Sequence, residues 1–106
     1  MSQSEELLEN AREATSFLKA LSNEHRLMIL CLLAEGERSV GELEGALQLR
    51  QPTLSQQLAR LRMDGLVDTR RDGKSIYYNL SSSEARQIVT LLYKLFCAQE
   101  AVAAAE

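Results

Sequence analysis

One segment decides the fold that we expect for the whole chain: Arg50-Gln-Pro-Thr-Leu-Ser-Gln-Gln-Leu-Ala-Arg-Leu-Arg-Met-Asp-Gly65. It predicts a helix, because Pro52 suits the first helical turn, where its missing N–H is no loss. Gly65 suits the position just past the helix end, where a positive φ is needed. Three leucines recur at positions i, i+4 and i+7 and therefore share one face of the helix: Leu54, Leu58 and Leu61.

The opposite face of this helix carries hydroxyl, amide and guanidinium groups, and no carboxylate before Asp64. These groups suit the major groove of DNA, because Gln can pair with adenine, Arg with guanine, and Thr can contact the thymine methyl. A polar outer face is also common on any amphipathic helix, so the helix alone leaves both interpretations open. The candidate DNA contacts are Gln51, Thr53, Ser55, Gln56, Gln57 and Arg60.

The flanking segments favour DNA binding. Ser39-Val-Gly-Glu42 is a capping box that begins a short helix, and a tight turn joins it to the Pro52 helix as a helix-turn-helix. Strands over 66–71 and 76–80 follow, joined by Asp72-Gly73, which is a strong hairpin signal. A basic hairpin in this place is a wing that contacts phosphate or the minor groove. Its basic residues are Arg70, Arg71 and Lys74.

The formal net charge of −3 argues weakly against nucleic acid, but the distribution of charge matters more. Residues 1–49 hold four basic and nine acidic residues, and residues 75–106 hold two and three. Residues 50–74 hold six basic and three acidic residues. The positive charge is thus concentrated where phosphates are expected.

The remaining segments predict three further helices. Ser4 caps the first, which runs to about Leu21, and Ser22 or Asn23 caps the second, over 24–35, which ends at Gly36. The second is apolar nearly all round, so we expect it at the centre of the fold. The last begins at a capping box, Ser81-Ser-Ser-Glu84, and runs to about Ala103, with a fraying tail.

The last helix has apolar residues on two sides, one with Ile88, Leu91 and Leu95, the other with Val89 and Phe96. A small domain seldom needs both sides, so we expect one to pack on its own domain and the other on a partner subunit, helped by the first helix. A two-fold dimer also sets two recognition helices one DNA turn apart. The expected fold over residues 1–106 is one mainly α domain with a small β-hairpin, a winged helix-turn-helix that dimerises through its first and last helices.

Other classes of protein are disfavoured. The N-terminus is polar and acidic, unlike a signal peptide, and the longest apolar run, residues 27–34, is far shorter than the roughly 20 residues of a membrane span. We expect a cytoplasmic protein with reduced cysteines and no membrane contact. No nucleophile with a paired base, glycine-rich phosphate loop or carboxylate motif is evident, so we expect neither an enzyme nor a cofactor.

Four motifs in order along the chain resemble the ArsR family. They are Leu21-Ser-Asn-Glu-His-Arg-Leu-Met-Ile-Leu30, Ser39-Val-Gly-Glu-Leu43, Pro52-Thr-Leu-Ser-Gln-Gln-Leu-Ala-Arg-Leu61, and Gly65-Leu-Val67 with Tyr77-Tyr78. The resemblance covers almost the whole chain. It implies a dimeric winged-helix repressor that releases operator DNA when it senses an inducer. With Cys31 and Cys97, the chain is similar to the BigR/SqrR-type persulfide sensors, which implies that sulfane sulfur bridges the two thiols.

The chain departs from the metal-sensing members of that family. Ser39-Val40-Gly41 stands where those members carry Cys-Val-Cys, and the last helix lacks their Asp and His ligands. We therefore predict no metal site. A metal-responsive repressor using Cys31, Cys97 and His25 stays open as an alternative, although such long spacing is a weak metal signal.

Cys31 and Cys97 are the only candidates for chemistry. Buried apolar packing is the usual fate of an intracellular cysteine, and Cys31 shares a face with Leu27. Cys97 projects with Arg86, which could favour the reactive thiolate. A direct disulfide needs Cα atoms within about 7 Å. A bridge with inserted sulfur spans more, so the separation of the two residues could select polysulfide over peroxide.

The sequence leaves three further alternatives open. The repressor could respond to thiol oxidants in general. Its cysteines could be inert, leaving a plain DNA-binding protein. The winged helix could also bind protein rather than DNA.

Overall fold

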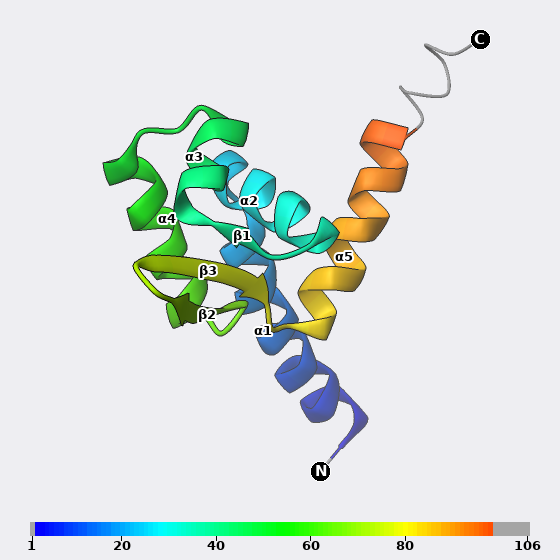
Figure 1. Ribbon diagram of the computed structural model, residues 1–106. Coiled ribbons are helices and arrows are strands. Elements are labelled where there is room, and N and C mark those ends of the chain that lie inside the picture. The colour runs from blue at the N-terminus through cyan, green and yellow to red at the C-terminus, as the bar shows by residue number, and fades with distance from the viewer. Residues whose placement is uncertain (1, 99–106) are drawn as a thin grey trace, which may run out of the picture.

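The computed structural model describes residues 2–98 as a winged helix-turn-helix, mainly α with a small sheet (Figure 1). This confirms the expected fold class. In chain order the elements are α1 (Gln3–Leu21), α2 (Glu24–Glu35), β1 (Arg38–Ser39), α3 (Val40–Leu47), α4 (Gln51–Met63), β2 (Val67–Asp72), β3 (Ser75–Leu80), α5 (Ser83–Tyr93) and the π-helix η1 (Lys94–Ala98).

Local capping residues define several helix ends as predicted. The Asn23 side chain accepts a hydrogen bond from the Arg26 amide at 3.1 Å and caps α2. The capping box of α3 is complete, since Ser39 Oγ accepts from the Glu42 amide at 3.1 Å and Glu42 accepts from the Ser39 amide at 2.9 Å. That amide lowers the pKa of Glu42 below its ordinary value. Gly65 follows α4 with a φ of +76°.

Two predicted helix starts were wrong by one or two residues. Ser2, not Ser4, caps α1, and its Oγ accepts from the Glu5 amide at 3.2 Å. Ser82, not Ser81, caps α5 and accepts from the Ala85 amide at 3.0 Å. Ser81 is engaged elsewhere, because its amide donates to the Leu66 carbonyl and its hydroxyl donates to the Gly65 carbonyl.

The end of the last helix also differs from the prediction. The α-helix stops at Tyr93 and continues as a π-helix over Lys94–Ala98. The predicted extension over 99–103 and the tail lie outside the described residues.

The sheet contains the predicted hairpin and one additional strand. Strands β2 and β3 pair antiparallel from Val67 opposite Leu80 to Asp72 opposite Ser75, around a turn in which Gly73 has a φ of +63°. Strand β1 pairs with the other edge of β3, so the order is β1-β3-β2. The sequence did not predict β1, because two residues are too few for an alternating pattern.

The core lies between α2, α4, the base of the wing and α5. All three leucines of the predicted α4 stripe are buried, together with three residues of α2. Helix α2 is central, as expected, although Met28 is exposed. The fully buried side chains are Ile29, Leu30, Leu33, Leu43, Leu54, Leu58, Leu61, Val67 and Val89.

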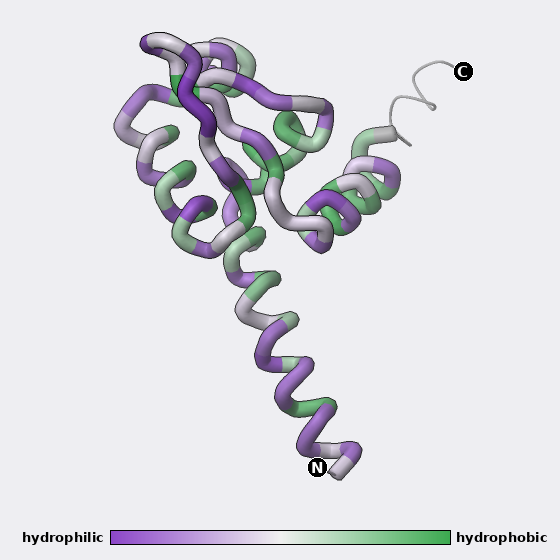
Figure 2. The backbone as a smooth tube through the Cα atoms, turned by 60° about the horizontal axis from the view of Figure 1, so that its bottom comes forward, coloured by the Kyte–Doolittle hydropathy of each residue, from purple (hydrophilic) through white to green (hydrophobic). Residues whose placement is uncertain are grey.

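Helices α1 and α5 leave the body of the molecule (Figures 1 and 2). Only Ala20 and Leu21 of α1 are buried, and α5 is anchored by Ala85 and Val89. The Cα radius of gyration is 15.9 Å, against about 13 Å for a compact chain of this length. The apolar side chains left exposed on α1, α5 and η1 are Leu7, Leu8, Leu18, Leu91, Tyr93, Leu95 and Phe96.

No helix within residues 2–98 has both the length and the apolar character needed to cross a membrane.

Candidate DNA interface and thiol groove

Helix α4 lies at the edge of the molecule (Figure 1). Gln51, Ser55, Gln56 and Arg60 are exposed there, while Thr53 and Gln57 are half-buried. The predicted DNA contacts on α4 therefore comprise four exposed side chains and two half-buried ones.

Two of these side chains already have partners in the free chain. Arg60 Nε donates to Asp64 Oδ2 at 2.9 Å, one helical turn further on. Gln57 Oε1 accepts from Arg26 Nη1 at 3.0 Å, so α2 holds this amide. The sequence analysis missed Arg26, because nothing local marks a contact with a residue 31 positions away.

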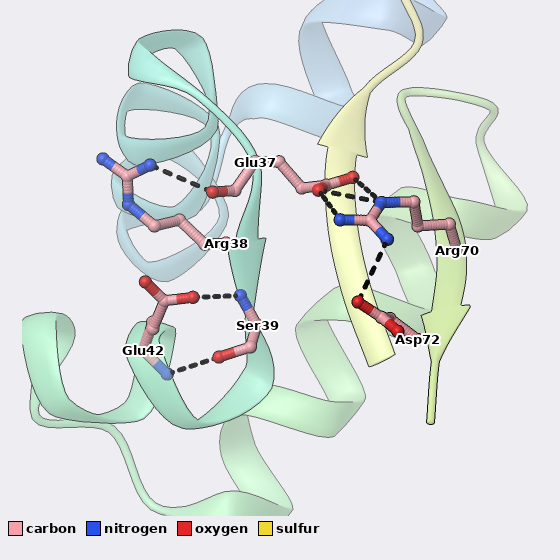
Figure 3. A network of polar contacts seen from close by, with 6 residues as sticks. All are labelled: Glu37, Arg38, Ser39, Glu42, Arg70 and Asp72. Carbon is pink, nitrogen blue, oxygen red and sulfur yellow. Dashed lines mark hydrogen bonds and ion pairs between the residues drawn. The ribbon is translucent and has the colours of Figure 1, made fainter. Parts of the chain in front are cut away.

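The basic wing residues also divide into paired and unpaired side chains. Glu37 accepts from Arg70 Nε and Nη2 at 2.7–3.0 Å (Figure 3). The Arg70 guanidinium also lies 4.7 Å from the centre of the Tyr77 ring. Arg71 and Lys74 form no ion pair within residues 2–98. Glu37 is therefore a wing-positioning residue that the sequence analysis also missed.

Cys31 and Cys97 line one groove between α2 and the α5–η1 helix, with a volume of about 540 Å³. The other lining residues are mainly apolar and include Leu27, Met28 and Tyr93. Cys31 is half-buried and Cys97 is exposed. Both cysteines are free thiols, and the structure brings them to one site, although they are far apart in sequence.

Burial raises the pKa of the Cys31 thiol above its ordinary value, and the negative charges of Cys97 and Glu35 raise it further. Cys31 is therefore mostly protonated at neutral pH. Arg86, which the sequence places on the same side of the last helix as Cys97, donates through Nη1 to the Ala34 carbonyl at 3.0 Å. His25, the third ligand in the metal alternative, does not line the groove.

The chain matches known regulators along most of its length. The model of bacterial regulatory proteins of the arsR family matches residues 23–69. The biofilm growth-associated repressor of Xylella fastidiosa is 52% identical over 91% of this chain and 84% of its own length.

Two solved structures extend the comparison. Reduced HlyU from Vibrio cholerae superposes with a TM-score of 0.84 at 49% identity, covering 87% of this chain and 97% of that one. A homodimeric winged helix-turn-helix DNA-binding domain, Mb0332 from Mycobacterium bovis, superposes with a TM-score of 0.72 at 32% identity, covering 96% and 91%. These relatives are regulators, not enzymes, and the chain belongs to the ArsR family of DNA-binding transcriptional regulators.

Proposed function

We propose that the chain is a homodimeric repressor that binds operator DNA and is released when sulfane sulfur bridges Cys31 and Cys97. The observation that carries this proposal is the shared groove, in which the two cysteines face an apolar lining between α2 and α5–η1. A covalent bridge in this groove would link α2, which packs against the helix-turn-helix, to the α5–η1 helix, which extends away from the core.

The DNA-binding part rests on α4 and the wing. The exposed side chains of α4 supply groups suited to base edges. Arg50, Arg62, Arg71 and Lys74 are exposed and suited to phosphates. Gln51, Thr53, Ser55, Gln56, Gln57, Arg60 and Arg70 remain proposed contacts.

The homodimer rests on the uncovered apolar residues of α1 and α5. Exposed apolar surface of this extent is unusual in a monomer and marks an interaction site. A relative with the same fold is described as homodimeric. A two-fold operator requires that pairing through these helices set the two α4 helices on the same side of the dimer.

The inducer chemistry is thiol–polysulfide exchange. The thiolate of Cys97, the exposed residue, attacks the central sulfur of an organic trisulfide, and one organic thiolate leaves. Deprotonated Cys31 then attacks the same sulfur, and the second organic thiolate leaves. Two protein thiols have lost two protons and two electrons, one sulfur is inserted between them, and the trisulfide has been reduced to two thiolates.

The bridge and operator DNA oppose each other through the angle between the two α4 helices. Linkage then requires reciprocity, so that bound DNA disfavours the bridge as much as the bridge disfavours DNA.

Operator affinity at fixed salt tests the proposal, with reduced and trisulfide-treated protein compared. We expect treated protein to bind more weakly, to recover with dithiothreitol, and to gain the mass of one sulfur less two hydrogens. Cys31→Ser and Cys97→Ser should bind DNA normally and not respond. A response that survives both substitutions would overturn the switch.

Peroxide treatment tests whether the chain is a sulfane-sulfur sensor or a sensor of thiol oxidants in general. If the separation of the thiols favours an inserted sulfur, peroxide should release DNA far less than trisulfide at equal extent of cysteine oxidation. Equal release by both would favour the general oxidant sensor.

The DNA interface is tested separately. Gln56→Ala and Arg60→Ala should each weaken operator binding by about 1–3 kcal/mol if they contact bases. Unchanged affinity in both variants would favour a protein-binding winged helix.

A further inference from the structure

Arg26 connects three helices through a single side chain. It is the third residue of α2, and its Nε donates to the Ala20 carbonyl at 2.6 Å, while Nη2 donates to the Lys19 carbonyl at 3.2 Å. Both carbonyls belong to the last turn of α1, where helical carbonyls lack partners within the helix. The third nitrogen, Nη1, donates to Oε1 of Gln57 on α4 at 3.0 Å.

This contact fixes the orientation of the Gln57 side-chain amide. A guanidinium has five N–H donors and no acceptor, so the atom of Gln57 that faces it must be the oxygen. The amide nitrogen, Nε2, therefore points away from Arg26. Gln57 is half-buried and Nε2 has no hydrogen bond within residues 2–98. No unpartnered side-chain nitrogen of the described residues is fully buried, so Nε2 keeps some contact with solvent.

The orientation decides which base edges Gln57 can recognise. A free glutamine amide pairs with adenine by donating to N7 and accepting from N6. Arg26 occupies one of the two lone pairs of the Gln57 oxygen and turns that oxygen toward α2, so the amide presents its two N–H donors on the other side. Such a group matches guanine, whose major-groove edge carries two acceptors, N7 and O6, and it accommodates thymine O4.

We infer that Arg26 is a specificity-determining residue, which holds Gln57 as a hydrogen-bond donor and so favours guanine over adenine at one position of each operator half-site. The inference rests on the proposed DNA-binding function. Arg26 itself acts through Gln57 and is a positioning residue.

The test uses operator fragments in which each half-site base pair is replaced in turn by the other three. Affinities of the full-length protein are measured at fixed salt. Wild type should prefer guanine over adenine roughly tenfold at one position, within the usual cost of a mismatched pair. Gln57→Ala should remove the preference there and leave the other positions unchanged. Arg26→Met frees the amide oxygen and should shift that same position toward adenine.

Arg26→Met also removes the hydrogen bonds to α1, so it could fold poorly. Gln57→Glu avoids this difficulty, since a carboxylate keeps the bond to Arg26 but has no N–H donor. We expect Gln57→Glu to retain or raise the melting temperature and to change the preferred base to cytosine, whose N4 amine is a donor. Gln87→Glu is the matched control, because it makes the same chemical change at an exposed position of α5 outside the proposed DNA interface.

The outcomes separate this inference from the proposed function. If wild type shows no dependence on operator sequence, specific DNA binding itself fails. If wild type discriminates but Gln57→Ala and Gln57→Glu leave every base preference unchanged, the inference alone is overturned. A wild-type preference for adenine at the position that Gln57→Ala affects also overturns it.

Discussion

The inner part of the molecule, α2 to β3, and the outer helices, α1 and α5, use leucine at similar helical spacings with opposite results. Leu54, Leu58 and Leu61 of α4 are at most 1% exposed, whereas Leu7 of α1 is 67% exposed and Leu91 of α5 is 49% exposed. The spacing identifies the apolar side of a helix in both cases. The spacing does not predict which surface packs against that side. On the outer helices, no part of the described chain covers it.

Charge and thiol chemistry follow the same division. The basic residues of α4 and the wing lie on the inner part, while α1 of the outer part carries four acidic and two basic residues. Cys31 lies on α2 of the inner part and is half-buried, whereas Cys97 lies on η1 and is exposed. The groove between them is where the two parts of the molecule meet.

The largest expected effect concerns the inner leucines. Leu58→Ala should lower the free energy of unfolding by about 2–5 kcal/mol, because a fully buried leucine leaves a cavity. Leu7→Ala, measured at concentrations where the chain is monomeric, should change it by less than about 0.5 kcal/mol. Urea unfolding measures both, and equal losses would remove the distinction between the two parts.

The next effect concerns the outer leucines in the proposed dimer. Leu91→Lys places a charge on the uncovered side of α5, and burial of an unpaired charge costs several kcal/mol. We expect the dimer dissociation constant to rise at least tenfold in sedimentation experiments. Gln87→Lys, on the same helix but at a polar exposed position, is the control. A dimer unaffected by Leu91→Lys would show that another surface covers the outer helices.

The salt dependence of DNA binding should distinguish the two arginines of the wing. Arg71→Ala should reduce the slope of log affinity against log salt by about 1, as expected for one phosphate contact. Arg70→Ala should reduce it less, because Glu37 already neutralises this guanidinium. Glu37→Gln should then increase the slope by releasing Arg70 to phosphate. Identical slopes for the two alanine variants would mean that Glu37 does not hold Arg70 in the complex.

The smallest effect concerns the two thiols. The pKa of Cys31 is raised, chiefly by burial, so less thiolate is present at neutral pH than for an ordinary cysteine. In single-cysteine variants, Cys31 should be alkylated several-fold more slowly than Cys97 at pH 7. The difference should narrow as pH rises through the raised pKa. Mass spectrometry measures both rates, and a faster Cys31 would contradict the assignment of Cys97 as first nucleophile.

Local signals predicted most of the fold. Pro52, the α4 leucines, Gly65, the Ser39–Glu42 box and the Asp72-Gly73 turn each act within a few residues, and the structure has the expected element at each. Ser4 and Ser81 were wrong because neighbouring serines compete for the same cap. The switch to a π-helix at Lys94 has no local signal in the sequence that we could identify.

The contacts that orient the candidate site were not predictable in this way. The Arg26–Gln57 bond joins residues 31 positions apart, and the Arg70–Glu37 bond joins residues 33 apart. Periodicity places Gln57 and Arg70 on polar surfaces but says nothing about which acidic or basic group meets them. Only the packing of α2 against α4, and of β1 against β3, brings these partners together.

The uncovered apolar stripe of α1 also has a consequence for the turnover of the protein in a cell. In a newly synthesised, unpaired chain Leu7, Leu8 and Leu18 are exposed to solvent. Exposed apolar surfaces of this kind are bound by chaperones and proteases, which remove unpaired subunits. On the proposed dimer, pairing hides the stripe by mass action. The cellular concentration of the repressor would then depend on dimerisation, because the unpaired monomers are the molecules that quality control degrades.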